Sequence, residues 1–535
     1  MKRLKTGWIG IGLLALILGG QAMANDEITR EALERQTDRL QAELRNLRKQ
    51  VAQLSGAANV ERPEGLNKGS RSGQATQADL DRAMEQVWQD LADLALAIYG
   101  LTPREPLEKP QKVHRKQVSA SGTAYRIRVT EKVRNRTVSL ANRGREVVVN
   151  PRLIVNGKRN WFSTASILEE ALAPGMSDRE NAVAIWQFLK DNRYHDSPAH
   201  TDVEVHDPVR FMNVYGYGFC DDSATNFMVL AEAAGLKARV WGLSGHVVPE
   251  AYFDGGWHML DPDGEIYYLD DDGESISSVK TLEQRPDIIR KYPSPYYTDA
   301  EKLIEIYSTT EDNRIADWYR RSSESVHTMG FVLRPGESLL RSWDNWGLYF
   351  ADRYLEAPRQ YGNGRFRFEP VFEDSLFRKG AKSVRGVQVK EGVLVAAQGR
   401  KGVLVYPFQS PYPVLGGKID VVGDVQGKGG IEVTFSENGE DWQTVWKVDE
   451  PGAVKAGIPM GGYFRNGYGR PVYAYFLRVS LSGAASVRKL VFESDVQVAP
   501  HSLPTLEEGE NTVRYVDESK GERQVGVTFA YDGMP

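Results

Sequence analysis

Cys220 is the one cysteine in a chain of 535 residues, so no disulfide within the chain constrains its fold. Its thiol is therefore either reactive or simply buried. The composition is that of a large globular protein, with 41% hydrophobic and 26% charged residues. This length exceeds what one core supports, which predicts several domains. A formal net charge of -5 provides no general attraction to nucleic acid or to acidic lipid.

The first 24 residues read as a signal peptide. Lys2, Arg3 and Lys5 form a basic start, an apolar stretch covers 9–18, and Ala22-Met23-Ala24 is a small-residue cleavage site. No later run approaches the roughly 20 apolar residues of a membrane helix. The sequence therefore predicts a bacterial periplasmic or secreted protein that begins at Asn25, and an uncleaved N-terminal anchor is the alternative.

The segment 26–54 has leucines and a valine at alternating spacings of three and four, which is typical of a coiled coil. Thr37 occupies one seam position. A homo-oligomer held by this segment is one prediction, and a single amphipathic helix on the protein's own surface is the other. A polar linker follows over 55–75, and a helical segment with an apolar stripe is expected within 76–113.

The remaining chain alternates between strand-like and helical patterns. Period-two alternation predicts a small β unit over 114–163, and helical stripes with capping residues return within 164–330. An aromatic-rich connecting region is expected over 331–380. Short strands between Gly and Asn turns predict a β-sandwich of jelly-roll type over 381–500, with a strand-like tail over 501–535.

The residues around Cys220 indicate a catalytic thiol. A helix is expected to begin at Cys220, and a helix N-terminus favours the thiolate, which is the nucleophile. Asp221 and Asp222 disfavour an adjacent thiolate, so the sulfur needs a positive partner. His246 is the best candidate, and neighbouring antiparallel strands would place Asp261 beside it. Thiol, imidazole and carboxylate form the minimum set for acyl transfer through a thioester.

Four sequence blocks resemble the transglutaminase-like superfamily. They read GFCDDSA at 218–224, AGLKARV at 234–240, GHVVPEAY at 245–252 and GGWHMLDPD at 255–263, in the family's order and spacing. The resemblance covers about 164–270 and implies a papain-like α+β core, in which a helix bearing the cysteine packs on an antiparallel sheet. It also implies that Cys220 is the nucleophile, His246 the base and Asp261 the orienting acid.

The sequence departs from the family directly after His246. Many relatives have a His-Ala-Trp pattern there, whereas Val247, Val248 and Pro249 follow here, a change that is expected to reshape the substrate groove. His258 is the rival imidazole, but on a regular strand it would face away from Asp261. The attacked carbonyl oxygen needs hydrogen-bond donors, for which the candidates are the Cys220 backbone N–H and the hydroxyls of Tyr215 and Tyr217.

No cofactor is predicted. Calcium on the acidic turns around 261–263 and 270–272 is the weaker interpretation, because Asp-Pro-Asp-Gly and Asp-Asp-Asp-Gly are first of all turn sequences. The histidines of the loop after 194 lie near aspartates without the spacing of a known metal motif, so a solvated loop is preferred. These residues are Asp261, Asp263, Asp270, Asp271 and Asp272 in the turns, and His195, His200, His206, Asp196, Asp202 and Asp207 in the loop.

The expected sandwich contains a Ser-x-Asn-Gly-x-x-Trp turn at 436–442 that resembles the one in discoidin-type jelly rolls, which often bind carbohydrate or cell surfaces. Trp442, Trp446, Tyr473 and Tyr475 could stack on sugar rings, although aromatic residues in such strands mostly fill the core.

The sequence as a whole predicts an exported multidomain α+β protein with a helical stalk, a papain-like core and a C-terminal sandwich. Its expected activity is acyl transfer or hydrolysis of an amide or ester, on a protein or peptide substrate, through a thioester at Cys220. Hydrolysis is favoured over cross-linking. The alternative is a catalytically inactive scaffold that binds exopolysaccharide or envelope glycan.

Overall fold

A computed structural model describes residues 110–197, 202–292, 294–295, 299–308, 314–316, 327–350, 358–397, 400–464 and 471–534. The predicted signal peptide, coiled coil, linker and most of the helical segment at 76–113 lie outside these residues, as does His200. The described residues belong to one compact unit that begins at Pro106. Among them, no helix is both long and apolar enough to cross a membrane.

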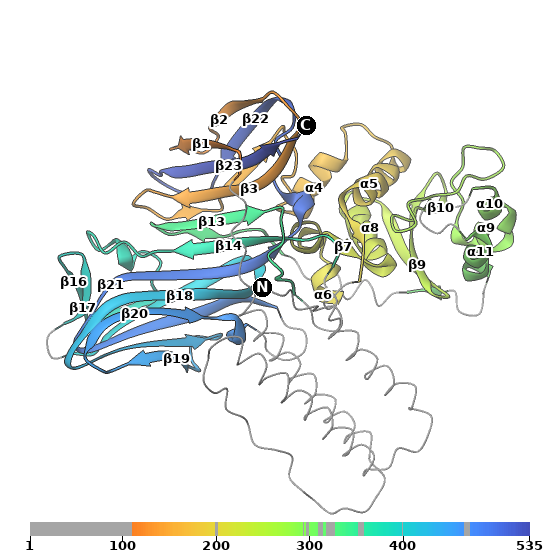
Figure 1. Cartoon of the computed structure of the whole chain (residues 1–535). Coiled ribbons are helices and arrows are strands. Elements are labelled where there is room, and N and C mark those ends of the chain that lie inside the picture. The colour runs from red at the N-terminus through yellow and green to blue at the C-terminus, as the bar shows by residue number, and fades with distance from the viewer. Residues whose placement is uncertain are drawn as a thin grey trace, which may run out of the picture. The chain divides into compact units, whose positions relative to one another are not determined.

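One antiparallel sheet joins strands from the beginning, middle and end of this unit (Figure 1). Its first six strands are, in spatial order, β1 (Lys112–Val118), β23 (Val525–Gly533), β3 (Val133–Asn142), β13 (Glu337–Ser342), β14 (Gly362–Phe368) and β21 (Val472–Val498). A smaller sheet orders β2 (Ala124–Val129), β22 (Gly509–Val516) and β5 (Arg152–Val155), and β4 (Val148–Val149) pairs with β12 (Val332–Leu333). The segments expected as a separate β unit, a connecting region and a tail are therefore parts of shared sheets.

Two long strands, β18 (Gly402–Ser436) and β21, dominate the C-terminal region. They pair antiparallel along most of their length, with register shifts that mark bulges or irregularities. At Gly417 the two strands come so close that only glycine fits, since an added Cβ would be 1.9 Å from the carbonyl oxygen of Glu493 in β21. The shorter strands beside them are β15 (Ser383–Arg385), β16 (Val387–Lys390), β17 (Val393–Ala396), β19 (Gln443–Val448) and β20 (Gly452–Pro459), and 3-10 turns cover Leu376–Arg378, Gly461–Tyr463 and Pro500–Ser502. This large β region agrees with the predicted sandwich.

The region predicted as the catalytic core has a helix packed on a sheet. Helix α8 (Cys220–Ala233) contacts β8 (Lys237–Leu243) and β9 (His246–Phe253), which lie in a sheet of order β10-β9-β8-β11. The other strands are β10 (Gly256–Met259) and β11 (Arg314–Ile315). Helices α4 (Thr164–Ala171) and α5 (Asp178–Asn192) also contact α8. This is the α+β arrangement that the resemblance implied.

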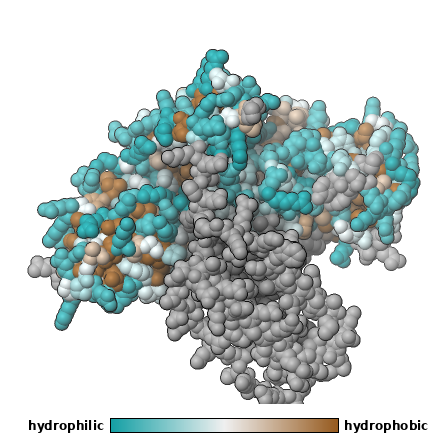
Figure 2. Space-filling model, viewed as in Figure 1, coloured by the Kyte–Doolittle hydropathy of each residue, from teal (hydrophilic) through white to brown (hydrophobic). Residues whose placement is uncertain are grey.

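The two faces of this small sheet are buried in different cores. Val240 and Ala251 belong to the main core together with Phe227 of α8, whereas Trp241 and Val248 belong to a second core. That second core also contains residues of α9 (Val279–Gln284), α10 (Pro286–Lys291) and α11 (Ala300–Ser308). Figure 2 shows a mostly hydrophilic face, with hydrophobic residues among the strands of the sandwich. Both faces of the small sheet β10-β9-β8-β11 are thus covered by hydrophobic side chains.

A π-helix links the core to the long strand β21. Short elements precede the cysteine: β6 (Tyr194–His195), α6 (Asp202–Val205), α7 (Pro208–Arg210), the π-helix η1 (Phe211–Tyr215) and β7 (Tyr217–Gly218). Gln497 of β21 donates through Nε2 to the Val214 carbonyl and to the Tyr217 hydroxyl. The Ala499 N–H donates to the Asn213 carbonyl. The strand region therefore supports the segment that leads into Cys220.

Candidate active site

Cys220 is the first residue of α8 and is half-buried. The preceding Phe219 is extended, and its N–H donates to Asp222 Oδ2 at 2.7 Å, which caps the helix. Gly218 leaves room for this carboxylate, because an added Cβ would lie 2.6 Å from Asp222 Oδ2. Asp222 Oδ1 also lies 3.3 Å from Nε2 of His206, a fully buried side chain. Asp222 thus pairs with a histidine as well as capping the helix.

His246 begins β9 and lies where the sequence predicted, between Cys220 and Asp261. Its Nε2 is 2.8 Å from Asp261 Oδ2, and both side chains are buried. The other Asp261 oxygen, Oδ1, accepts the backbone N–H groups of Asp263 and Gly264, each at 2.9 Å. Because the His246 Nε2 contacts Asp261, the other ring nitrogen, Nδ1, is the one available to hydrogen-bond the Cys220 thiol.

The environment of His246 favours its charged form. Burial by itself lowers the imidazole pKa, but the Asp261 carboxylate and the hydrogen bond with Cys220 together raise the pKa well above its usual value. A protonated imidazole beside the thiol favours the thiolate by charge attraction. The structure therefore brings the Cys220 thiol, the His246 imidazole and the Asp261 carboxylate together.

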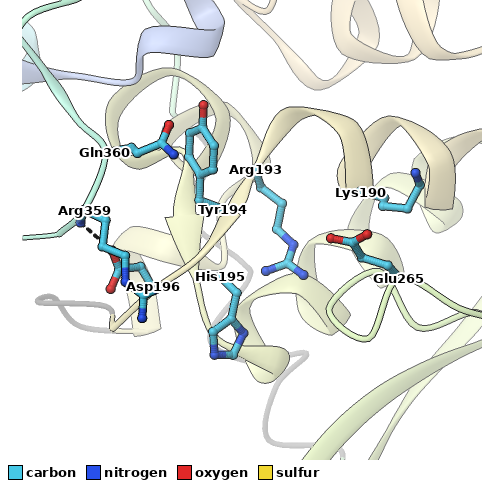
Figure 3. A pocket seen from close by; sticks show the side chains of 8 residues that line it. All are labelled: Lys190, Arg193, Tyr194, His195, Asp196, Glu265, Arg359 and Gln360. Atoms are coloured by element: carbon cyan, nitrogen blue, oxygen red, sulfur yellow. Dashed lines mark hydrogen bonds between the residues drawn. The ribbon is translucent and has the colours of Figure 1, made fainter. Parts of the chain in front are cut away.

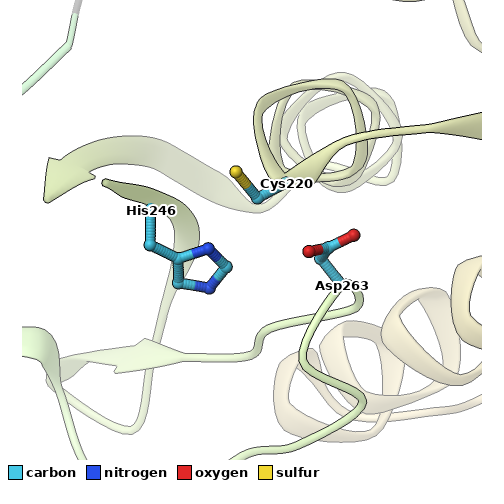
Figure 4. Close-up of side chains that lie close together, drawn as sticks. All are labelled: Cys220, His246 and Asp263. Carbon is cyan, nitrogen blue, oxygen red and sulfur yellow. The ribbon is translucent and has the colours of Figure 1, made fainter. Parts of the chain in front are cut away.

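Asp263 is a second carboxylate at the site, which the sequence analysis considered only as a turn residue or calcium ligand. One of its carboxylate oxygens, one nitrogen of His246 and the Cys220 sulfur all lie within 4.8 Å of one another (Figure 4). Asp263 Oδ1 is 2.7 Å from Arg193 Nη1 and 2.8 Å from His195 Nδ1.

Charge pairing keeps Asp263 ionised although it is fully buried. Burial opposes ionisation, but His195, Arg193 and His246 bring its pKa down to about 2. Arg193 also donates to the Pro262 carbonyl at 2.8 Å, so it holds the turn that carries both aspartates. The spacing of Asp261 and Asp263 was visible in the sequence, whereas Arg193 gave no signal. His195 was expected in a solvated loop, and this expectation was wrong, because His195 lies in β6 and is bonded to the buried Asp263.

The two tyrosines considered as oxyanion donors have partners elsewhere. Tyr215 and Tyr217 are fully buried. The Tyr215 hydroxyl donates to Glu204 at 3.1 Å, and the Tyr217 hydroxyl accepts from Gln497 at 3.0 Å. The backbone N–H of Cys220, in the first turn of α8, lies among the donors that an α-helix leaves without intrahelical partners. Of the three candidate oxyanion donors, this N–H is the one that belongs to Cys220 itself.

The rival histidine lies apart from this arrangement. His258 Nδ1 and Nε2 contact the carbonyl oxygens of Ile276 and Phe253, and its ring stacks on Phe253 with centroids 4.0 Å apart. These contacts agree with the prediction that His258 faces away from Asp261.

The other acidic residues considered for calcium contact protein groups. Asp270 accepts from Ser277, Asp271 pairs with Arg285, and Asp272 accepts the N–H groups of 274 and 275. In the loop after 194, the carboxylates of Asp196 and Asp207 likewise accept backbone N–H groups. In one further cluster, one ligand atom each of His206, Asp221 and Asp222 lies within 4.8 Å of the others.

The aromatic residues considered for sugar stacking divide between core and surface. Tyr475 is buried and stacks on Phe408 with centroids 4.9 Å apart. Trp446 packs against the core, while Trp442 lies beneath the Arg478 guanidinium at 4.3 Å. The Tyr473 hydroxyl contacts the buried Glu204. The turn at 436–442 forms as expected, with the Gly439 N–H donating to the Ser436 hydroxyl.

Comparison with known proteins identifies one domain. Residues 165–262 match the model of the transglutaminase-like superfamily. None of the curated proteins matches the chain. Among solved structures, the infectious bursal disease virus VP2 subviral particle is 10% identical over 80% of this chain and 83% of that chain, with a TM-score of 0.15. A structure of the infectious bursal disease virus Gt strain is also 10% identical, over 81% of this chain and 84% of that chain, with a TM-score of 0.14. Scores this low carry no argument.

Proposed function

Because residues 165–262 form a transglutaminase-like domain, we propose that this protein is a cysteine-dependent enzyme that cleaves an amide or ester through a thioester at Cys220. The observation that supports this most is the 2.8 Å contact between His246 Nε2 and Asp261 Oδ2, with the cysteine thiol at the other side of the ring. Such a ring is oriented by its carboxylate and is able to exchange a proton with the sulfur.

The first half of the proposed reaction forms the thioester. The Cys220 thiolate attacks the carbonyl carbon, and an Sγ–C bond forms while the carbonyl oxygen becomes negative. In this proposal the Cys220 backbone N–H donates a hydrogen bond that stabilises that oxygen. When the tetrahedral intermediate collapses, the C–N or C–O bond breaks, and His246 gives its proton to the leaving amine or alcohol.

The second half releases the acyl group. Water, or an acceptor amine, loses a proton to His246 as it attacks the thioester carbonyl, and the Sγ–C bond breaks to restore the thiolate. Asp261 holds the ring in one orientation in both halves and stabilises its positive charge. We favour water as the acceptor, in keeping with export to an aqueous compartment.

The enzyme proposal is testable with p-nitrophenyl acetate, an activated ester that needs no specific binding site. We expect a burst of p-nitrophenol, a mass increase of one acetyl group on Cys220, and continued turnover. Cys220→Ala should abolish all three, and His246→Ala should slow acetylation and stop turnover. Turnover that persists in Cys220→Ala would contradict the proposal. A parent protein that is not acetylated at Cys220 would favour the inactive scaffold for envelope glycan.

Export and assembly complete the proposal. The basic, apolar and small-residue stretches within 1–24 support cleavage after Ala24 and a periplasmic or secreted location. The heptad pattern at 26–54 supports a homo-oligomer, and the Ser-x-Asn-Gly-x-x-Trp turn at 436–442 supports glycan contact by the sandwich. N-terminal sequencing of the processed protein should begin at Asn25, and an intact Met1 would contradict cleavage.

A further inference from the structure

A second group of side chains that are able to bind a metal lies at the first turn of α8. One ligand atom each of His206, Asp221 and Asp222 lies within 4.8 Å of the others. The segment between α6 and α7 supplies the histidine, and α8 supplies both aspartates in the two positions after Cys220. The group shares no side chain with the catalytic residues, so the proposed reaction gives it no role.

Two members of this group are buried, although a solvated loop was expected for His206. The His206 side chain is fully buried and Asp222 is 1% exposed, while Asp221 is half-buried. A carboxylate taken out of water is costly unless a positive charge or hydrogen bonds compensate it. A dication compensates both adjacent carboxylates at once, whereas a protonated histidine carries a single charge.

The separation of His206 and Asp222 fits two ligands of one cation better than it fits a hydrogen bond. Nε2 of His206 is 3.3 Å from Oδ1 of Asp222, beyond the range of about 2.7–3.2 Å for an N–H···O hydrogen bond. Ligands that bind a tetrahedral zinc ion at about 2.0–2.2 Å lie about 3.3–3.6 Å apart. Two ligand atoms are therefore already at the separation of a zinc site, and a rotation of the half-buried Asp221 side chain brings in the third.

A buried hydroxyl one turn further along α8 indicates a ligand at the same place. Thr225 is fully buried, and its Oγ1 has no hydrogen-bond partner among the described residues. Helical side chains lean towards the helix N-terminus, over the residues three and four positions earlier, which here are Asp222 and Asp221. Asn226 ties this turn to the segment before His206, since its Nδ2 donates to the carbonyl of residue 205 at 2.6 Å. The Thr225 oxygen is therefore directed at the carboxylate pair, where a cation satisfies it.

We propose that His206 Nε2, Asp222 Oδ1 and the Asp221 carboxylate bind zinc, with the Thr225 hydroxyl at the fourth position. The ion links the first turn of the nucleophile's helix to the segment between α6 and α7. It takes no part in the proposed reaction steps, so this inference goes beyond the proposed function and does not depend on it. Calcium fits this group less well, because calcium takes oxygen ligands.

Zinc binding is measured by calorimetry in Cys220→Ala, which is first stripped with a chelator and lacks the thiol as an alternative ligand. We expect one zinc ion per chain. Asp221→Asn in this background should weaken zinc binding at least about tenfold, since even the loss of an outer-shell partner costs about 10–100-fold. Thr225→Val should also weaken zinc binding, yet leave the zinc-free protein no less stable in urea, because the hydroxyl it removes makes no hydrogen bond.

Asp196→Asn is the matched control. Asp196 is also a half-buried aspartate next to a histidine, His195, and both line a cavity at the end of α5 (Figure 3). This variant should bind zinc as its Cys220→Ala parent does. No zinc binding, binding that Asp221→Asn or Thr225→Val leaves unchanged, or an equal loss in Asp196→Asn would overturn the inference. None of these results bears on thioester formation, which p-nitrophenyl acetate tests separately in the protein with Cys220 intact.

Discussion

Replacing Asp263 by asparagine should destabilise the folded protein by an amount that depends on pH. The carboxylate is fully buried and is paired with Arg193, whose side chain is 3% exposed. Folding lowers the Asp263 pKa from 3.8 to about 2, because the pairing with His195 and Arg193 outweighs the cost of burial. At about 1.4 kcal/mol for each pH unit, this contributes about 2.5 kcal/mol near neutral pH.

The variant also leaves the Arg193 guanidinium buried without its counter-charge. Breaking a buried ion pair by removing one partner costs about 3–5 kcal/mol. We therefore expect Asp263→Asn to lower the free energy of unfolding by about 3 kcal/mol at pH 7. Urea denaturation followed by tryptophan fluorescence measures this difference. Asp287→Asn is the control, since Asp287 pairs with Arg285 on the surface and should have little effect.

The pH dependence gives the sharper test. A carboxyl whose folded pKa is depressed stabilises the fold fully above its unfolded pKa, and this contribution is lost as the pH falls through the folded pKa. The difference between the parent protein and Asp263→Asn should therefore be constant above about pH 5 and shrink between pH 4 and pH 2. A difference in the free energy of unfolding below about 1 kcal/mol at pH 7, or one that stays unchanged at pH 3, would refute the assignment of Asp263 and Arg193 as a buried ion pair.

Three further outcomes are expected. Gly218→Ala should slow alkylation of Cys220, because the new Cβ would displace the Asp222 carboxylate that caps the nucleophile's helix; an unchanged rate would contradict this. Tyr473→Phe removes a donor from the buried Glu204 and should cost about 1–3 kcal/mol in urea denaturation, whereas no loss would show that this contact is dispensable. EDTA should leave p-nitrophenyl acetate turnover unchanged, because the proposed steps use only protein groups; a chelator-sensitive turnover would indicate a required metal.

The sequence was sufficient to predict the centre of the site. The blocks around Cys220, His246 and Asp261 are local, and each carries its own turn or strand signal, so their meeting followed from a helix packed on adjacent strands. The helix start at Cys220 was likewise predictable, because Gly218 and the acidic residues after the cysteine mark a helix N-terminus.

The surroundings of the site depend on contacts that local patterns do not encode. Arg193 ends a helix whose stripe and caps were readable, yet its pairing with Asp263 joins segments about 70 positions apart. The pairing of β1 with β23 similarly joins the two ends of the described unit, and alternation along either strand says nothing of its partner. Strand patterns therefore indicated β structure without its long-range order.

Alkylation of Cys220 by iodoacetamide against pH tests the proposed site most directly, and the absence of any other cysteine in the sequence makes the reaction specific. With His246 intact, we expect rapid alkylation at pH 6, where an ordinary thiol with a pKa of about 8.5 reacts slowly. His246→Ala should move the profile to that of an ordinary thiol. Slow alkylation at pH 6 in both proteins, with superimposable profiles, would contradict an activated cysteine–histidine pair.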